Sequence, residues 1–534
     1  MPAEDHRGAD LAADENRALR RGWWSFGPRP RYWLTRFALL RGLGFIYLVA
    51  FFSLSQQLVP LLGADGLTPV VAFLDRVASL RPDGLERAWQ VPSLFWLGAS
   101  DAVLVGCAWV GVGLSVLLLM GLANVPLLVA LWALYTSFVN VGQVWYGYGW
   151  ETLLLEAGFL AIFLVPPLDP RPWSGATPPP RQVVWLFRWL VFRVMFGAGL
   201  IKMRGDPCWT ELTCLAHHYE TQPNPNPLSY YLHAAPVWFH ELGVLFNHGV
   251  ELIAPWFVFG PRRARHVAGG LIVAFQAALI LSGNLSFLNW LTLVVALACF
   301  DDAAWARLLP RPARDRVRAW NAPGGHEVEP SKAREGVSWA LVILVGILSM
   351  NPVVNMLSRD QWMNASYDPL RLVNTYGAFG TVGKVRHEVI IEGTSDPRPG
   401  PDTEWKEYEF PCKPGDPERR PCVVTPYHHR LDWQMWFAAL GDVRREPWTA
   451  QLAYKLLEGD PSVKPLFTHD PFPDPDRPPR FVRMSLWRYA FTDPSADTDA
   501  WWRRERLEEA FLHPVHLDHP AFRRFLEAHG WLRD

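Results

Sequence analysis

The side chains best suited to chemistry lie in an apolar segment at 182–201, in a second one at 236–260, and in the loop between them. A charge inside an apolar segment is costly, because it must find a partner or water. Four candidates end the first segment or lie within the second: Lys202, Glu241, His248 and Glu251. Glu241 and His248 are seven residues apart, about two helical turns, so they share one face of a helix.

Two interpretations are open for this set. In a water-filled cavity, a desolvated Lys202 could act as a base, with the acidic residues and His248 as partners. Otherwise the same groups are ion pairs between helices, with lysine and arginine side chains extended toward the ends of the spans. Other charged residues could join either arrangement: Arg188 and Arg193 in the first segment, and Glu151 and Glu156 in the span before it.

The positions of these residues depend on how the chain is divided between membrane and water. Half of the 534 residues are hydrophobic, and they gather in runs long enough to cross a bilayer. Residues 357–534 have no such run and are rich in charge and proline. We therefore predict a membrane all-α multi-pass helical bundle, followed by a soluble C-terminal β-rich α+β domain. The formal net charge of −1 gives no indication of nucleic-acid binding.

About nine spans are predicted. They occupy 36–59, 101–120, 122–140, 150–166, 182–201, 236–260, 266–283, 285–300 and 336–356. The chain then divides into a cytoplasmic N-terminal segment (1–35), a transmembrane helical domain (36–356) with an outer loop (202–235), and a C-terminal domain (357–534). The first 30 residues hold no apolar run of the kind found in a cleavable signal peptide.

The distribution of basic residues predicts the orientation. With the N-terminus in the cytoplasm, the basic clusters at 262–265 and 307–318 also face the cytoplasm. Nine crossings place the loop 202–235 and the C-terminal domain on the opposite side, in the periplasm, the lumen of the endoplasmic reticulum or the extracellular space.

Four of the six cysteines fall on this outer side, where disulfides persist. These are Cys208, Cys214, Cys412 and Cys422. Local pairing, Cys208 with Cys214 and Cys412 with Cys422, is the simplest connectivity, and the spacings of six and ten residues permit it without proving it. Neither pair has the CxxC spacing of a metal site, so we predict disulfides rather than a metal.

Alternation of apolar and polar residues predicts strands in the C-terminal domain at 385–393, 404–410 and 479–492. Two further segments, 445–460 and 501–512, are predicted to be helices.

Other motifs carry less chemistry. The aromatic and glycine-rich run 139–156 is typical of a membrane-interface belt, or it could shape a lipid or peptide groove. The histidine pairs His217/His218 and His428/His429 have no carboxylate or cysteine at ligand spacing, so no metal is predicted there. We find no fingerprint of a serine hydrolase, zinc protease, P-loop or dinucleotide site, and we predict no cofactor.

Long stretches resemble the lipase maturation factor family over nearly the whole chain. They include WLTRFALLRGLGFIYLVAF (33–51), WYGYGWETLLLEAGFLAIFL (145–164), FRVMFGAGLIKMRGDPCWTELTCLAHHYETQPNPNPLSYYLH (192–233), FNHGVELIAPWF (246–257), GNLSFLNWLTL (283–293), NTYGAFGTV (374–382) and YHHRLDWQMWFAALG (427–441). The resemblance implies a multi-pass protein of the endoplasmic reticulum that helps dimeric lipases such as lipoprotein lipase fold and assemble. The arginine-rich composition is typical of a bacterial protein, which would lie in the inner membrane instead.

The membrane part is also similar, more weakly, to the membrane domain of vitamin K-dependent γ-glutamyl carboxylase. The shared pieces are a helix ending in AGLIKM (198–203), a loop, and a polar helix near HGVEL (248–252). In that enzyme a lysine at the matching place deprotonates the vitamin, so this resemblance implies that Lys202 is a base.

We therefore predict a maturation factor in the membrane that binds rather than catalyses. Its outer surface, formed by 202–235 and 357–534, would hold apolar surface of incompletely folded secreted proteins, with membrane lipids as its other partners. The alternative is a membrane-embedded enzyme that acts on a lipid, quinone or peptide, with Lys202 as base. A transporter is disfavoured, because inverted repeats are not evident.

Overall fold

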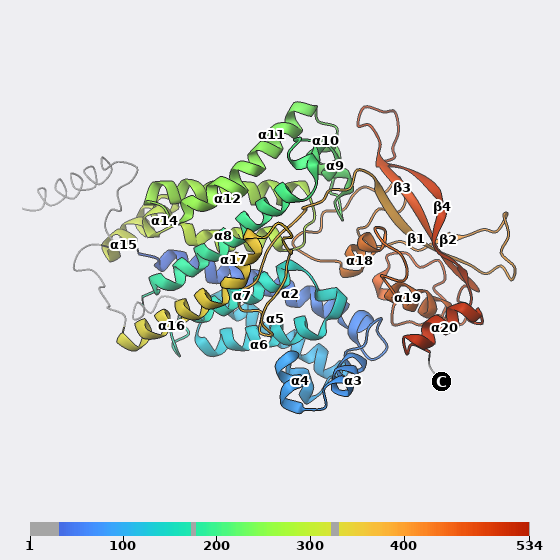
Figure 1. The fold of residues 1–534 in the computed structure, drawn as a ribbon, viewed down its shortest axis with the longest axis horizontal. Coiled ribbons are helices and arrows are strands. Elements are labelled where there is room, and N and C mark those ends of the chain that lie inside the picture. The colour runs from blue at the N-terminus through green and yellow to red at the C-terminus, as the bar shows by residue number, and fades with distance from the viewer. Residues whose placement is uncertain (1–30, 172–177, 322–330, 533–534) are drawn as a thin grey trace, which may run out of the picture.

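The computed structural model describes residues 31–171, 178–321 and 331–532. The described residues between Trp33 and Leu357 are mainly helical, and a four-stranded sheet with three further helices follows (Figure 1). The helical part comprises α2 (Trp33–Leu62), α3 (Val70–Leu80), α4 (Gly84–Gln90), α5 (Asp101–Met120), α6 (Val125–Val141), α7 (Gly149–Ile162), α8 (Arg181–Arg204), α9 (Cys214–Thr221), α10 (Pro227–His233), α11 (Val237–His248), α12 (Arg262–Ser282), α13 (Leu288–Ala296), α14 (Asp302–Leu308), α15 (Arg311–Asn321), α16 (Lys332–Leu348) and α17 (Met350–Leu357).

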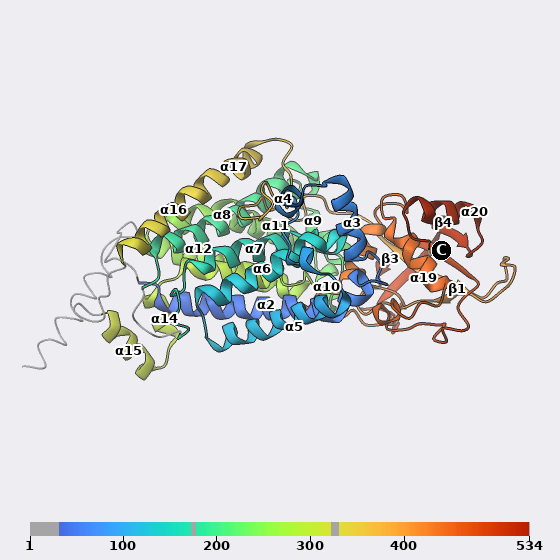
Figure 2. The same cartoon turned by 90° about the horizontal axis from the view of Figure 1, so that it is seen from below.

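In the described part of the chain, six helical segments are long and apolar enough to cross a membrane. They are Trp33–Leu62, Asp101–Met120, Arg181–Arg204, Val237–Phe259, Arg262–Ser282 and Lys332–Leu357. The predicted number of about nine is therefore too high by this measure. The other three predicted spans are the shorter helices α6, α7 and α13, which run beside the long helices (Figures 1 and 2). Twelve of the fourteen residues of α7 are buried, so this helix is surrounded by protein rather than lipid.

One end of the bundle is held together by two neighbouring aspartates. Asp302 accepts hydrogen bonds from the backbone N–H groups of Trp33 and Leu34 at 3.1 and 2.8 Å, so it caps the start of α2. Asp301 forms ion pairs with Arg262 and Arg265 at the start of α12. Burial raises the pKa of Asp302 to about 6, although the two backbone donors act against this shift. The C-terminal sheet lies at the opposite end of the molecule (Figure 1).

The sheet is antiparallel, with strand order β2-β1-β3-β4. Strand β1 (Arg386–Thr394) and strand β3 (Phe481–Phe491) confirm the predictions at 385–393 and 479–492. The predicted strand at 404–410 shortens to β2 (Lys406–Glu407).

The predicted helix at 501–512 is wrong, because this segment is strand β4 (Trp502–Val515). Its arginine, glutamate and leucine residues favour a helix locally, but pairing along β3 outweighs that preference. Trp502 is buried and stacks on Phe491 of β3, with ring centroids 4.1 Å apart. Tertiary packing therefore decides the conformation here.

Three helices connect the sheet to the bundle or cover it: α18 (Arg430–Ala438), α19 (Trp448–Leu457) and α20 (Pro520–Ala528). The structure confirms the helix predicted at 445–460, and every residue of α19 is buried. Trp448 at its start packs edge-on against Trp145 of the bundle, with centroids 5.2 Å apart. Helix α19 thus lies between the sheet and the helical part.

Candidate functional site

Lys202 lies near the end of α8 and forms a buried ion pair with Glu251. The ammonium Nζ is 2.6 Å from both carboxylate oxygens and 3.2 Å from Oδ1 of Asn247. Asn247 also donates to the same carboxylate at 3.0 Å. Lys202 and Glu251 are each only 4% exposed, so protein rather than water neutralises both charges.

A local change of helix type places Glu251. Residues Gly249–Ile253 form a π-helical turn between α11 and a 3-10 segment, Ala254–Phe259. Pro255 lacks an N–H group, and in an α-helix its ring would clash with the carbonyl of Glu251, four residues earlier. The wider turn accommodates the proline, and π-turns of this kind recur at functional sites.

The loop after α8 closes over the ion pair. His248 bonds through Nε2 to the backbone oxygen of Trp209 at 3.0 Å, and the Trp209 ring centroid is 5.0 Å from Nζ of Lys202. Trp209 lies in a segment that a disulfide closes between Cys208 and Cys214, with Cα atoms 4.8 Å apart. The structure thus brings three of the four predicted residues, Lys202, His248 and Glu251, to one place.

Glu241 does not belong to this group. Its side chain is exposed on α11, and among the described residues it forms no ion pair with Lys202 and no hydrogen bond to His248. Asn247, which was not predicted, contacts both Lys202 and Glu251 in place of Glu241. The signal was present, because residues four apart on a helix are neighbours. The resulting geometry is that of a closed ion pair.

The other charged residues of the predicted set have separate partners. Arg193 pairs with Glu156, and its guanidinium also donates to the backbone oxygen of Asn374 at 2.7 Å. Tyr376 donates to Glu156 at 2.7 Å. Arg188 donates to the backbone oxygen of Ala298 at 2.9 Å and to the Tyr32 hydroxyl at 2.7 Å. These contacts match the interpretation of polar groups that join helices.

Glu151 finds its partner far along the chain, in Arg430 of α18, at 2.9 Å. The backbone N–H of Arg430 donates to Gln57 of α2 at 2.8 Å, so this residue contacts two helices of the bundle. Arg430 lies inside the stretch 427–441 that resembles the family, but its role was not predicted. No local spacing relates it to Glu151, so only the fold could show the pair.

A second network joins the outer loop to the sheet. The Arg386 guanidinium in β1 donates to the backbone oxygens of Glu220 and Pro223, both at 2.9 Å, and to that of Gln222. Glu388, two residues further on the same face of β1, pairs with Arg386 and with Lys413. All three charged side chains are at most 1% exposed.

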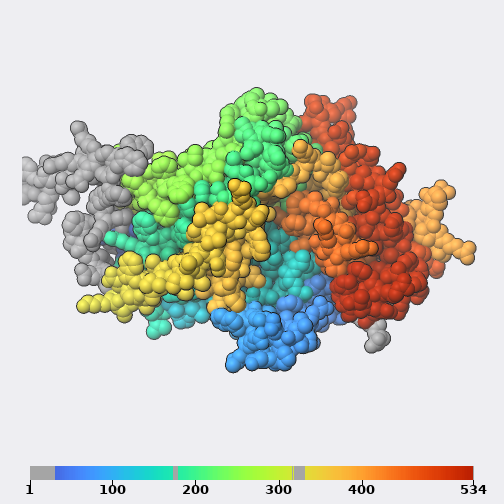
Figure 3. All heavy atoms as spheres, viewed as in Figure 1, coloured from blue at the N-terminus to red at the C-terminus, as the bar shows by residue number. Residues whose placement is uncertain are grey.

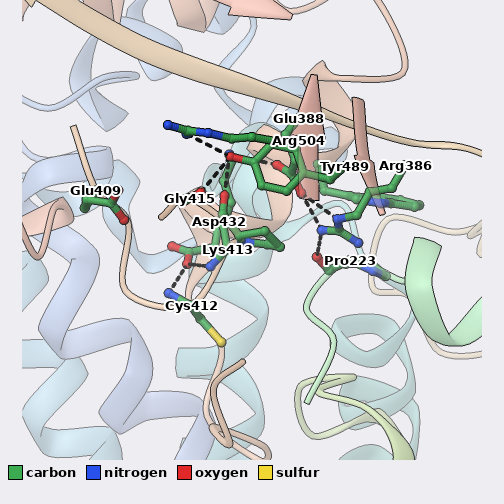
Figure 4. Close-up of polar contacts among 12 residues, drawn as sticks. Pro223, Arg386, Glu388, Glu409, Cys412, Lys413, Gly415, Asp432, Tyr489 and Arg504 are labelled. Atoms are coloured by element: carbon green, nitrogen blue, oxygen red, sulfur yellow. Dashed lines mark hydrogen bonds and ion pairs between the residues drawn. The ribbon is translucent and has the colours of Figure 1, made fainter. Parts of the chain in front are cut away.

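The segment that carries Lys413 is fixed from α18. Asp432 accepts hydrogen bonds from the backbone N–H groups of Cys412 and Lys413 at 2.7 and 2.8 Å (Figure 4). Burial raises the pKa of the Asp432 carboxyl, although nearby His429 and these donors act against it. Cys412 forms a disulfide with Cys422, and the Cα atoms are 5.4 Å apart. Both disulfides thus follow the local pairing considered for the sequence.

The buried histidine of each pair is packed among aromatic rings. His218 meets Phe379 edge-on with centroids 4.8 Å apart, and His428 meets Tyr148 at 4.9 Å. Burial lowers the pKa of His218 to about 4, and the positive charge of Lys202 contributes to the shift. Burial also holds the pKa of His428 well below its usual range. In the described ranges, no group of three or more His, Cys, Asp or Glu side chains could hold a metal ion.

Comparison with known proteins gives a consistent result along the chain. A family model described as the lipase maturation factor transmembrane domain matches residues 34–307. A second one, described as the lipase maturation factor C-terminal domain, matches residues 372–512. No solved structure matches the chain.

Curated relatives are similar over most of their length. Lipase maturation factor 1 of Bos taurus is 48% identical over 503 residues, which cover 90% of this chain and 89% of the relative. Lipase maturation factor 1 of Homo sapiens is 46% identical over 519 residues, 94% of this chain and 90% of the relative. Lipase maturation factor 2 of Homo sapiens is 30% identical over 614 residues, 93% of this chain and 85% of the relative. These names do not support the alternative of an enzyme acting on a lipid, quinone or peptide.

Proposed function

The chain belongs to the lipase maturation factor family, and we propose that it helps lipases and similar secreted proteins to fold and assemble at a membrane surface. Its helices make it a multi-pass membrane protein. We propose that it acts by binding a client rather than by catalysis. The ion pair of Lys202 with Glu251 is then a structural contact, because the buried ammonium group already has Glu251 and Asn247 as partners.

One observation carries this proposal: Arg386 binds three successive parts of the outer loop through backbone oxygens, at Glu220, Gln222 and Pro223. Backbone contacts of a buried guanidinium hold the loop whatever its side chains are. The loop and the C-terminal sheet therefore form one rigid surface, which is what a client-binding platform requires. The pair of Arg430 with Glu151 fixes the same surface to the bundle.

We propose that this surface faces the lumen of the endoplasmic reticulum, or the periplasm if the source is bacterial. The basic residues Arg262 and Arg265 lie at the end of the bundle where Asp301 and Asp302 join α12 to α2. Cytoplasmic loops carry an excess of lysine and arginine, which supports placing that end in the cytoplasm. The sheet and both disulfides would then lie outside.

Only some of the large aromatic residues in 357–534 can contribute to a client surface. Trp433 and Trp448 are buried against aromatic rings of the bundle, and Trp502 is buried in the sheet, so these side chains cannot meet a client. Large exposed apolar side chains gather instead at the end of α17 and just after it: Leu357, Trp362, Met363 and Tyr367. We propose that this segment contacts the incompletely folded client.

A photo-crosslinking amino acid at Trp362 or Tyr367 tests this in cells that secrete a lipase. We expect crosslinks to newly made lipase that disappear once the lipase has folded. Two matched positions serve as controls: Trp339, which is 52% exposed on the membrane-spanning α16, and Asp402, which is exposed in a polar loop of the C-terminal domain. Equal crosslinking at all four positions, or none to any secreted protein, would contradict the proposal.

A further inference from the structure

The connection between α2 and α5 is a helical hairpin that leaves most of its apolar side chains uncovered. It comprises α3, α4 and a 3-10 turn at Leu94–Leu97. Helix α3 buries only Val70 and Leu74, and α4 buries no residue. The exposed fractions are high for several large apolar residues: Leu80 72%, Leu85 85%, Trp89 60% and Leu97 91%. In Figure 3 this segment (blue) protrudes from the side of the molecule.

Local contacts fix the hairpin even though it packs little. Asp83 caps α4 by accepting from the backbone N–H of Leu85 at 2.8 Å. Asn140 on α6 donates to the backbone oxygen of Pro92 at 2.9 Å, and Ser137 accepts from the N–H of Leu94 at 2.9 Å. Isolated helices below about 12–15 residues are marginal in water, so a hairpin of 11- and 7-residue helices must be covered by something.

We propose that lipid covers it, and that the hairpin lies in the membrane interface on the side of the C-terminal domain. Its attachment at Ser137 and Asn140 is at the end of α6, and Asp101 at the start of α5 accepts from the N–H of Ala64 at 2.8 Å. The hairpin therefore sits where spanning helices end. Leucine and tryptophan beside charged residues are typical of helices that lie in the headgroup region.

The exposed apolar surface continues from the hairpin along the membrane-spanning α5. Val103, Trp109 and Val110 are 42%, 49% and 55% exposed, so the surface of α5 that faces lipid begins next to Leu97. The hairpin itself carries three acidic and three basic side chains, Asp75, Arg76, Arg81, Asp83, Glu86 and Arg87. Its attachment to lipid is therefore apolar and independent of the charge of the membrane. This inference does not rest on the proposed client function.

Depth-dependent quenching in the full-length protein tests the proposal. Residue Leu85 or Leu97 is replaced by cysteine in a Cys107→Ser/Cys299→Ala background, labelled with an environment-sensitive fluorophore, and placed in phosphatidylcholine nanodiscs. We expect quenching by a lipid spin label near the headgroup end of the acyl chain, and less by one near the methyl end, because interfacial helices lie about 5–10 Å deep. Anionic lipid and high salt should leave the quenching unchanged. The control label at Asp402 should respond only to a water-soluble quencher.

A double substitution, Leu85→Glu with Trp89→Glu, sharpens the test. Because α4 buries no residue, the bundle should still fold, which gel filtration checks, while the label at Leu97 shifts toward the behaviour of Asp402. Gln90→Glu, an exposed polar position in the same helix, should have no effect. The proposal is overturned if the label at Leu85 is as open to the water-soluble quencher as the label at Asp402. It is also overturned if only an added unfolded lipase, and not lipid, protects that label.

Discussion

The guanidinium of Arg430 on α18 lies 2.9 Å from the carboxylate of Glu151 on α7, although 279 residues separate them in sequence. Both side chains are at most 1% exposed. The Arg430 guanidinium also lies over the Tyr146 ring, 3.6 Å from its centroid. This pair binds the C-terminal part of the chain to the bundle in a place that water does not reach.

Replacement of Arg430 by leucine should destabilise the protein strongly. It leaves the Glu151 carboxylate buried without its partner, which typically costs about 3–5 kcal/mol. We expect a clear fall in the thermal unfolding midpoint of the detergent-solubilised protein. Arg444→Leu, at an exposed arginine shortly after α18, should change it little. A double variant, Arg430→Leu with Glu151→Gln, should recover part of the loss, and additive effects would argue against direct coupling.

Lys202→Met should lower the amount and stability of the protein rather than remove a chemical activity. The substitution leaves Glu251 and Asn247 without the ammonium that both contact. A second substitution, Glu251→Leu, should restore stability, because it removes the unpaired charge. Thermal unfolding of the four forms in a double-mutant cycle gives the coupling energy.

Glu241→Gln is the matched control for that cycle. This carboxylate is exposed, so its change should alter stability by no more than about 0.5 kcal/mol. If Lys202→Met instead kept normal stability and abundance but abolished lipase maturation, the structural role of the pair would be wrong.

Peptide mapping under non-reducing conditions should recover two linked pairs, Cys208 with Cys214 and Cys412 with Cys422. Cys107 and Cys299 should react as free thiols after denaturation. Loss of one native disulfide should lower stability by roughly 2–4 kcal/mol, which Cys412→Ala with Cys422→Ala would reveal. Recovery of all six cysteines as free thiols from cells would place these regions in the reducing cytoplasm and contradict the orientation.

Acidification should destabilise the outer loop (202–235) through His218. In the folded protein burial holds its pKa at about 4, whereas an exposed histidine has a pKa near 6.5, so the unfolded chain binds the proton first. The contribution of neutral His218 to the free energy of unfolding is complete above about pH 6.5 and is lost as the pH falls toward about 4. His428 acts in the same direction. His218→Gln should therefore reduce the fall of the unfolding midpoint between about pH 7 and about pH 5, and an unchanged slope would exclude His218 as its source.

Periodicity predicted strands β1 and β3, because the alternation of apolar and polar residues depends on local sequence. The same reasoning failed at 501–512, where residues with helical preference pair with β3. Apolar runs also located α7, but they could not show that other helices enclose it. Properties that depend on neighbours distant in sequence were therefore the ones predicted poorly.

The same difference between local and distant contacts applies to the candidate site. Lys202 and Glu251 were chosen because charges in apolar segments need partners, and the structure pairs them. Glu241 was included because helical spacing places it on a shared face with His248, but spacing alone does not give the direction of that face. The contact of Arg386 with the outer loop was not predicted, because its partners there are backbone oxygens, which the amino-acid sequence does not display.

The cap that Asp302 provides for α2 has a consequence for synthesis. The first amides of α2 leave the ribosome 268 positions before the carboxylate that binds Leu34. Helix α2 therefore lacks this cap at its start until 268 further residues have been translated. We expect nascent chains that stop before Asp302 to leave the first N–H groups of α2 without this acceptor. Such chains should be degraded even when several of their helices are already inserted in the membrane.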